Sequence, residues 1–308
     1  NPGLVIMPTG TGKSEIIKAV AIDWLQSGAN RVIIAVPNRE LARQHRAGFY
    51  LHNGSNLIPT FCLLGYPLAK ASRLVVTTYA SLNKVTEYLQ SARVGKGRLL
   101  LIADECHHVN RLATSYLELV SYFPFRIGFS ATPWTLGNRQ VFGTEPAYFL
   151  SLSEAQRLNL VCNYTITIEQ TLRPDPAKAY QLYFVRASDR FRGTIKATGV
   201  MHDDRKDRER VLKNDELIER FRSGALSCLF VNRMLLEGFD CPQVKRIYIE
   251  KRTQSPLLAY QMFGRGLRNY RSQSLKVFVD TPEMSDLLCH ALQMANDPNA
   301  EDQSWLEW

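Results

Sequence analysis

Short, continuous apolar runs alternate with longer stretches of helical spacing in the first half of the chain. The runs predict strands at residues 4–7, 31–36, 74–77, 99–103 and 126–129. Between the first two runs, apolar residues recur every three or four positions, and Gly28 follows at the place of a helix C-terminal cap. This alternation is typical of β-α-β units around a mainly parallel sheet, so we expect an α/β fold.

A second series of the same kind follows a change of texture over residues 151–171. There an Asn- and Thr-containing segment, and then Arg173-Pro174-Asp175-Pro176, interrupt the pattern. Further runs predict strands at residues 182–185, 227–231, 246–250 and 275–279, and residues 203–222 are expected to form a helix. We therefore expect two lobes, 1–155 and 156–281, each a mainly parallel sheet flanked by helices.

Residues 282–308 differ in charge from the rest of the chain. They contain acidic residues and no Lys or Arg, and they end in Trp305-Leu306-Glu307-Trp308. Two alternatives stay open: a helix packed on the second lobe, or the start of further sequence. An acidic tail of this kind could also bind a protein partner.

Composition and charge narrow the functional class. The chain has 308 residues, 45% of them hydrophobic, which suits two ordinary globular cores and excludes a disordered or fibrous protein. Its net charge of +9 favours a polyanionic partner such as nucleic acid. No apolar run approaches the roughly 18 residues that a membrane span needs, and the six cysteines form no CxxC pair. We expect an intracellular protein, cytoplasmic or nucleoid-associated, without a membrane partner.

The strongest chemical signal is a loop between the first strand and the first helix, Pro8-Thr9-Gly10-Thr11-Gly12-Lys13-Ser14. Glycines let backbone N–H groups surround a phosphate, and the helix N-terminus adds its dipole. Lys13 can reach the β- and γ-phosphates of a nucleotide, and the Ser14 hydroxyl can bind Mg²⁺. The alternative is a Gly- and Thr-rich turn without a ligand.

A second signal is the pair of carboxylates, Asp104 and Glu105, that ends the apolar run at residues 99–103. Phosphoryl transfer needs a metal clamp and a positioned nucleophile. Asp104 can hold Mg²⁺ through water, and Glu105 can orient and deprotonate the attacking water. A pair of this kind on its own is more often a helix cap, but a phosphate loop upstream makes it the expected second half of an ATP site.

With these residues in place, the chain resembles the superfamily 2 helicases and translocases of the DExH type, whose core is two tandem RecA-like domains. Asp104-Glu105-Cys106-His107 resembles motif II, and the phosphate loop resembles motif I, in which the leading glycine is commonly absent. The other motifs follow in order: residues 37–44 resemble motif Ia, 76–79 motif Ib, 130–133 motif III, 183–188 motif IV, 235–242 motif V and 261–268 motif VI. Motifs V and VI are most similar to those of type III restriction motors and DNA repair translocases.

The resemblance implies ATP and Mg²⁺ as cofactors and roles for residues of the second lobe. Gln261, Arg265 and Arg268 would lie on one helical face and present arginine fingers to the γ-phosphate, although surface arginines are the alternative. Gly238 and Asp240 would belong to the nucleotide site, Asp240 at the ribose or in the network that transmits its state. The family's adenine-reading motif lies upstream of this chain's first residue, so we expect a preceding segment.

The same resemblance places three coupling residues and a nucleic-acid track on the first lobe. Ser130 and Thr132 would couple the ATP site to the track, and His107 is expected to form an interlobe hydrogen bond rather than to bind zinc. The side chains expected to meet phosphates are those of Arg39, Gln44, Thr77 and Thr78. We expect an ATP hydrolase that moves along nucleic acid, DNA in preference to RNA. The alternatives are an RNA helicase or RNA-sensing ATPase, and a restriction or antiviral motor that translocates without separating strands.

Overall fold

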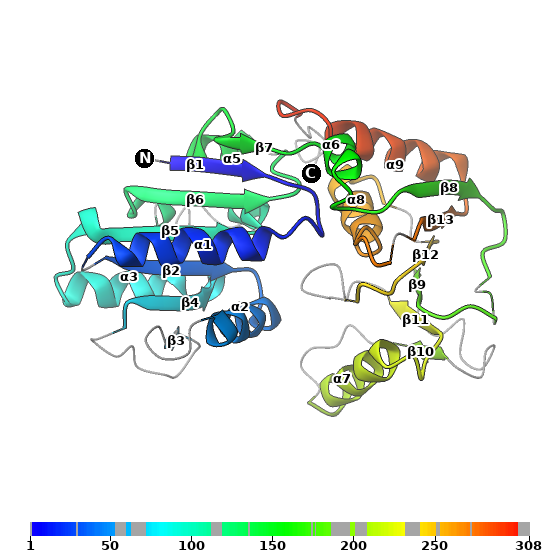
Figure 1. Ribbon diagram of the computed structural model, residues 1–308, viewed down its shortest axis with the longest axis horizontal. Helices are drawn as coiled ribbons and strands as arrows, with labels where there is room; N and C mark the ends of the chain where they lie inside the picture. The colour runs from blue at the N-terminus through cyan, green and yellow to red at the C-terminus, as the bar shows by residue number, and fades with distance from the viewer. Residues whose placement is uncertain are drawn as a thin grey trace. The chain divides into compact units, whose positions relative to one another are not determined.

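The chain divides into two compact units, one built mainly from the residues up to Ser151 and the other mainly from Leu152–Asn296. The computed structural model (Figure 1) describes residues 2–28, 30–52, 60–62, 72–111, 119–134, 136–173, 175, 177–185, 198–200, 208–231, 241–250, 253–271 and 273–300. The boundary expected from the sequence, between residues 155 and 156, comes slightly after the division at Ser151 and falls within α6 (Leu152–Arg157).

The first unit is a seven-stranded sheet in the order β3-β4-β2-β5-β6-β1-β7. All its strand pairs are parallel. The strands are β1 (Pro2–Ile6), β2 (Arg31–Val36), β3 (Thr60–Cys62), β4 (Leu74–Thr78), β5 (Leu99–Asp104), β6 (Phe125–Ser130) and β7 (Tyr148–Phe149). The five predicted strands are confirmed, and the two that the apolar pattern did not predict, β3 and β7, are short strands at the two edges of the sheet.

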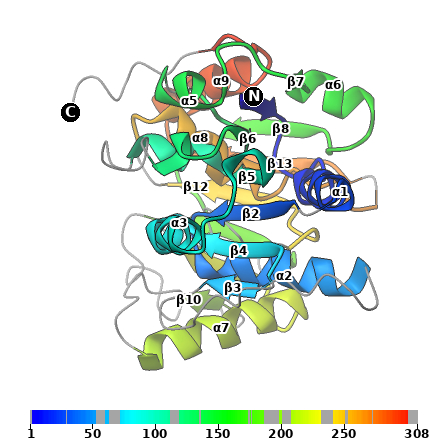
Figure 2. The ribbon, with the colours of Figure 1, turned by 90° about the vertical axis from the view of Figure 1, so that its left-hand side faces the viewer.

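Helices cover both faces of this sheet, as a parallel sheet requires. They are α1 (Lys13–Gln26), α2 (Arg39–His52), α3 (Leu82–Ser91) and α5 (Leu136–Phe142), with 3-10 turns η1 (Tyr79–Ser81), η2 (Lys96–Arg98) and η3 (Cys106–Arg111). Side chains from α1 and α2 join one buried cluster, and side chains from α3 and α5 join the other. Figure 2 shows α1 and α3 on opposite sides of β2 and β5. Gly28, with φ of +110°, follows α1 as expected of a C-terminal cap.

The second unit is a six-stranded sheet in the order β10-β11-β9-β12-β13-β8, again with all pairs parallel. Its strands are β8 (Tyr164–Ile168), β9 (Gln181–Phe184), β10 (Thr198–Val200), β11 (Cys228–Val231), β12 (Arg246–Ile249) and β13 (Leu275–Val279). Its helices are α6, α7 (Arg208–Arg222), α8 (Pro256–Gly264) and α9 (Pro282–Met294). The predicted α/β fold with two mainly parallel sheets is confirmed.

A row of aromatic rings crosses the second sheet at one register level. The Tyr183 and Tyr248 ring centroids lie 5.2 Å apart, and those of Tyr248 and Phe278 lie 4.8 Å apart. On the other side, Phe230 stacks on Tyr183 at 5.0 Å. Because these four residues are register partners on β11, β9, β12 and β13, the row fixes the alignment of the four strands.

Residues 282–294 form α9, a helix that packs on the second sheet. This agrees with the first of the two alternatives for the segment, a helix packed on the second lobe. The Thr281 hydroxyl caps the helix by accepting a hydrogen bond from the Met284 backbone N–H, and Pro282 follows in the first turn. The helix contacts α8, β8 and β13. Residues 301–308 lie outside the described part of the chain. In that part, no helix is both long and apolar enough to cross a bilayer.

Candidate functional site

The predicted chemical residues of the first unit gather where three adjacent strands end. The sheet order places β6 between β5 and β1, and all three run in the same direction. Asp104 is the register partner of Phe129, and the Met7 backbone N–H donates to the Ser130 carbonyl at 3.1 Å. The phosphate loop, the acidic pair and Ser130 therefore lie at one carboxyl edge, where ligands of open α/β sheets bind.

The loop after β1 has the backbone of an anion site. Gly10 and Gly12 have φ of +89° and +90°, a left-handed conformation that glycine adopts without steric cost. The α1 helix starts at Lys13 with Gly12 as its N-cap, and no side chain caps it. The first N–H groups of α1 and the helix dipole are thus directed at the space above the loop, where a phosphate can accept hydrogen bonds.

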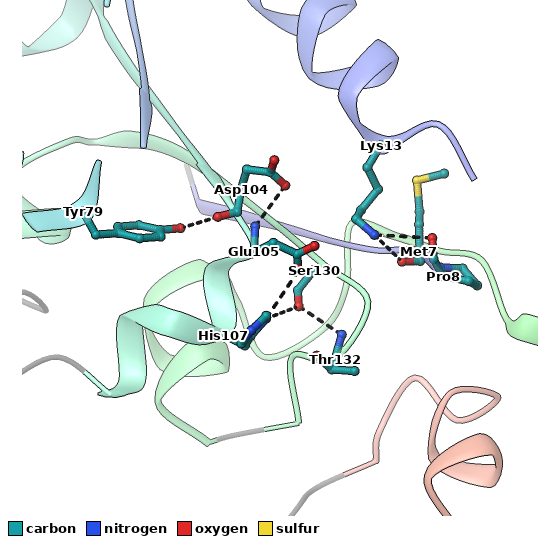
Figure 3. A network of polar contacts seen from close by, with 9 residues as sticks. All are labelled: Met7, Pro8, Lys13, Tyr79, Asp104, Glu105, His107, Ser130 and Thr132. Carbon is teal, nitrogen blue, oxygen red and sulfur yellow. Dashed lines mark hydrogen bonds and ion pairs between the residues drawn. The ribbon is translucent and has the colours of Figure 1, made fainter. Parts of the chain in front are cut away.

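Lys13 lies across this loop. Its side chain is buried, and its Nζ donates to the backbone carbonyls of Met7 at 3.2 Å and Pro8 at 3.3 Å (Figure 3). The ammonium is therefore held at the loop by neutral carbonyl oxygens, which a phosphate oxygen can replace with a stronger, charge-assisted bond. Ser14, the next residue, is exposed on the first turn of α1.

Asp104 is buried at the end of β5 and holds three hydrogen bonds. Its Oδ1 accepts from the Glu105 backbone N–H at 3.0 Å, its Oδ2 lies 2.8 Å from His45 Nε2, and its carbonyl accepts from the Tyr79 hydroxyl at 2.7 Å. Burial alone raises the pKa of the Asp104 carboxyl. The hydrogen bond and charge of His45, the charge of Lys13 and the Glu105 N–H outweigh burial and hold that pKa below its usual value. Asp104 is therefore a carboxylate at neutral pH.

Glu105 has a strained backbone. Its φ is +50°, which costs a residue with a Cβ about 1–2 kcal/mol. Strain of this kind persists where the surrounding structure imposes it, and it clusters at functional sites. Glu105 Oε2 lies 3.5 Å from His107 Nδ1, and its side chain keeps 16% of its surface exposed. A carboxylate so placed is held by its neighbours and still open to a water molecule.

His107, Ser130 and Thr132 form one chain of hydrogen bonds behind the acidic pair. His107 Nδ1 lies 3.0 Å from Ser130 Oγ, which also accepts from the Thr132 backbone N–H at 3.0 Å (Figure 3). This network is internal to the first unit. Among the described residues, no group of three or more His, Cys, Asp or Glu side chains could hold a metal ion by itself.

The residues predicted to contact nucleic acid differ in exposure. Arg39 is exposed at the start of α2, and Gln44 is half-buried on the same helix. Thr78 is nearly buried, with its hydroxyl donating to Ser81 Oγ at 3.3 Å. Thr77 is fully buried and its hydroxyl donates to the Thr78 carbonyl. The contact of Thr77 with a phosphate stays a prediction, and it would require this buried side chain to become accessible.

Motif VI departs from the predicted geometry. Gln261 lies on α8, but the helix ends at Gly264 and Arg265 is its C-cap. Arg268 lies beyond the helix and forms an antiparallel bridge with Val161. The prediction that all three side chains share one helical face is therefore wrong for Arg268. Gly238 and Asp240 lie outside the described residues.

Gly266, just after the end of α8, packs closely against β12 and β13. A Cβ at this position would lie 2.3 Å from Leu275 Cδ1 and 3.1 Å from Ile247 Cδ1, so the close approach requires glycine.

His45, a buried partner of Asp104, is not among the residues that the sequence motifs indicate. It shares the buried face of α2 with Ala42 and Phe49, at helical spacing. In the sequence, His45 could be noticed only as a histidine among the apolar positions of a predicted helix. That pattern does not indicate Asp104 as its partner, because Asp104 is 59 residues away in the sequence.

Comparison with known proteins agrees with this geometry. Residues 1–135 match the family model of the type III restriction enzyme res subunit. The chain is 23% identical to a 51.5 kDa protein of Lactococcus phage (isolate 7-9) over 90% of its own length and 65% of the relative's. It is 29% identical to the DNA 3'-5' translocase XPB2 of Sulfurisphaera tokodaii over 42% of its length and 27% of that protein's. The chain thus spans less than two-thirds of either relative.

Solved structures share the fold. The type ISP restriction-modification enzyme LlaBIII, bound to DNA, has a TM-score of 0.70 at 14% identity over 97% of this chain and 28% of its own. S. cerevisiae Dbp5, bound to RNA and ADP BeF3, has a TM-score of 0.67 at 16% identity over 99% of this chain and 87% of its own. The chain therefore shares the two-unit fold of these proteins. Within it, residues 1–135 are similar to the restriction-enzyme res subunit.

Proposed function

We propose that this chain is a nucleic-acid-dependent ATPase that uses ATP hydrolysis to move along DNA. The observation that supports it most is that Lys13, Asp104 and Glu105 follow the carboxyl ends of β1 and β5, two parallel strands that only β6 separates. A cation on an anion-binding loop and two carboxylates with different surroundings are what phosphoryl transfer from ATP requires.

The residues present fit ATP with Mg²⁺. The loop offers backbone N–H groups to phosphates, while the Ser14 hydroxyl and the Asp104 carboxylate are the oxygen donors that Mg²⁺ prefers. When bound, Mg²⁺ would neutralise charge on the β- and γ-phosphates. The loop from Pro8 to Ser14, Thr9 and Thr11 included, would bind the phosphate chain, and Gly238 and Asp240 are assigned to the same nucleotide.

In this proposal Glu105 is the general base. It accepts a proton from a water molecule, the water oxygen bonds to the γ-phosphorus, and the bond from the γ-phosphorus to the β-γ bridging oxygen breaks to leave ADP and inorganic phosphate. Glu105 suits this task because its side chain is partly exposed beside the buried, ionised Asp104. We assign Gln261, Arg265 and Arg268 to the γ-phosphate, and His107, Ser130 and Thr132 to the coupling between ATP and the strand.

DNA is the favoured track for two reasons. The sequence matches are to a restriction-enzyme subunit and to a DNA translocase, and these carry more weight than likeness of fold. An RNA substrate is supported only by the fold of Dbp5, at 16% identity. The proposed contacts with the strand are Arg39, Gln44 and Thr78. Contacts of this kind go to phosphates and are independent of the base sequence.

The test is the rate of ATP hydrolysis with no nucleic acid and with single-stranded DNA, duplex DNA or single-stranded RNA of equal length. We expect DNA to stimulate hydrolysis more than RNA does, and a Lys13→Ala variant to show no stimulation. Stimulation by RNA alone would replace the DNA proposal, and no hydrolysis under any condition would overturn the ATPase assignment. A strand-displacement assay beside a translocation assay then separates a helicase from a restriction-type motor that leaves the duplex intact.

A further inference from the structure

We propose that His45 is a positioning residue for Asp104, and that it ties helix α2 to the carboxylate that binds the metal. The inference rests on the proposed ATPase function and adds to it a residue that none of the motif assignments contains. His45 touches neither nucleotide nor metal in this proposal, and acts by fixing the carboxylate that does.

The contact between the two side chains is short and shielded from water. His45 Nε2 and Asp104 Oδ2 are 2.8 Å apart, and the two side chains keep 1% and 5% of their surface exposed. Because the Glu105 N–H binds Oδ1 at 3.0 Å, each carboxylate oxygen has its own donor. Two donors from different directions fix the rotation of the carboxylate, and the remaining lone pairs then point in a set direction. Mutation of a group that orients a metal-binding side chain in this way typically costs about 10- to 100-fold in metal affinity or activity.

His45 is itself held by α2. The neighbouring turns of that helix bury Ala42 and Phe49 in the core beneath β2 and β4, so the imidazole cannot turn away without moving the helix. The same helix carries Arg39 and Gln44, the proposed contacts with a nucleic-acid backbone, and Gln44 directly precedes His45. A shift of α2 on binding a strand is thus passed to Asp104 through one hydrogen bond.

The other ring nitrogen argues against a merely structural role. His45 Nδ1 is buried, and no group in the described part of the chain makes a hydrogen bond to it. A buried polar atom without a partner costs stability, so its presence calls for an explanation. Here the cost is tolerated because Nε2 is needed at Asp104.

The test compares His45→Gln with His45→Leu. A glutamine amide can place its nitrogen close to the position of Nε2 and donate to Asp104, whereas leucine has a similar volume and no donor. Two quantities are measured: the Mg²⁺ concentration that gives half-maximal ATP hydrolysis, and the binding of Mn²⁺ in the presence of ADP, followed by electron paramagnetic resonance without turnover. We expect leucine to weaken both by roughly 10- to 100-fold, the range for residues that orient metal ligands, and glutamine to recover most of the loss.

Leu25→Ala is the matched control, because it removes volume from the same buried cluster at the last turn of α1 and leaves His45 and α2 unchanged in sequence, and it should leave both metal measurements unchanged. If His45→Leu does not fold, His45→Asn takes its place, since its amide is polar but stops short of Asp104. Wild-type metal dependence in a folded leucine or asparagine variant would overturn the inference, and so would an equal loss in Leu25→Ala. Absence of hydrolysis and Mn²⁺ binding in the wild type would instead refute the proposed function itself.

Discussion

Gly266 provides the sharpest link between packing and the site. A methyl group at this position would lie 2.3 Å from Leu275 Cδ1, 3.0 Å from Leu275 Cδ2 and 3.1 Å from Ile247 Cδ1. Both neighbours are fully buried on adjacent strands, so neither can turn out to solvent. Gly266→Ala should therefore destabilise the protein by about 1–3 kcal/mol, the usual cost of forcing a methyl group into a packed core. Arg265 precedes this turn and Arg268 ends it, so ATP hydrolysis should fall as well.

A double-mutant cycle separates the clash from other effects. Leu275→Ala removes the two closest carbons, leaves Ile247 Cδ1 in place, and alone should cost about 2–5 kcal/mol. In the double variant the new methyl group occupies part of the space that Leu275 vacates. Gly266→Ala should then cause no further loss of stability, and the coupling free energy between the two substitutions should be about 1–3 kcal/mol.

Thermal unfolding measures this, since about 1 kcal/mol shifts Tm by roughly 2–4 °C in a chain of 150–250 residues. The control is Gly97→Ala, where a Cβ would meet nothing within 4 Å. Additive losses in the cycle, or a Gly266→Ala variant as stable as the wild type, would refute the packing argument.

Four further outcomes follow from the site. Lys13→Ala should abolish ATP turnover because the phosphates lose the loop's ammonium, and near-normal turnover would contradict the phosphate-loop assignment. Glu105→Gln should bind nucleotide but hydrolyse it very slowly, because an amide cannot accept the proton; single-turnover hydrolysis beside nucleotide binding checks this. Nucleic-acid affinity should fall steeply with salt, as titration between low and moderate salt will show, and Arg39→Ala should flatten that slope by about one phosphate contact. Folding lowers the pKa of the Asp104 carboxyl. The stability that the ionised carboxylate contributes is therefore fully present above the usual pKa of the group and is lost as pH falls through the lowered pKa. The difference in unfolding free energy between wild type and Asp104→Asn should accordingly shrink in strong acid.

The apolar pattern predicted the strands that lie inside the two sheets and missed those at their edges. β2 and β13 have the bounds predicted for them, because both are interior strands made mostly of buried apolar residues. β8 escaped prediction since it is an edge strand with Thr165 and Thr167 exposed, and its polar positions resemble a linker. Such strands are fixed by pairing with β13, which a local pattern does not contain.

The site shows the same division between local and distant information. The loop around Lys13 and the pair at Asp104 could be predicted because each chemical group lies within a few residues of the strand that positions it. The position of Arg268 could not, because α8 ends before it and Arg268 pairs with Val161, which is far from it in the sequence. The role of His45 could not be predicted either, since its partner is brought to it only by the pairing of β2 with β5.

Glu105 and Ser130 are connected through one nitrogen atom, Nδ1 of His107. The positions of these two neighbours determine whether that nitrogen carries a hydrogen. His107 Nδ1 faces Ser130 Oγ at 3.0 Å and Glu105 Oε2 at 3.5 Å. If Nδ1 carried a lone pair, it would oppose the negative charge of Glu105, whereas an Nδ1–H attracts that carboxylate and donates to the Ser130 oxygen. The carboxylate therefore favours the Nδ1–H form of His107. One hydrogen is then shared between the serine of motif III and the proposed general base. Because Ser130 Oγ also accepts from the Thr132 N–H, a displacement of Thr132 alters how strongly His107 holds Glu105. The coupling proposed for Ser130 and Thr132 therefore has a defined physical route, in which the position of the loop after β6 tunes the carboxylate at the end of β5.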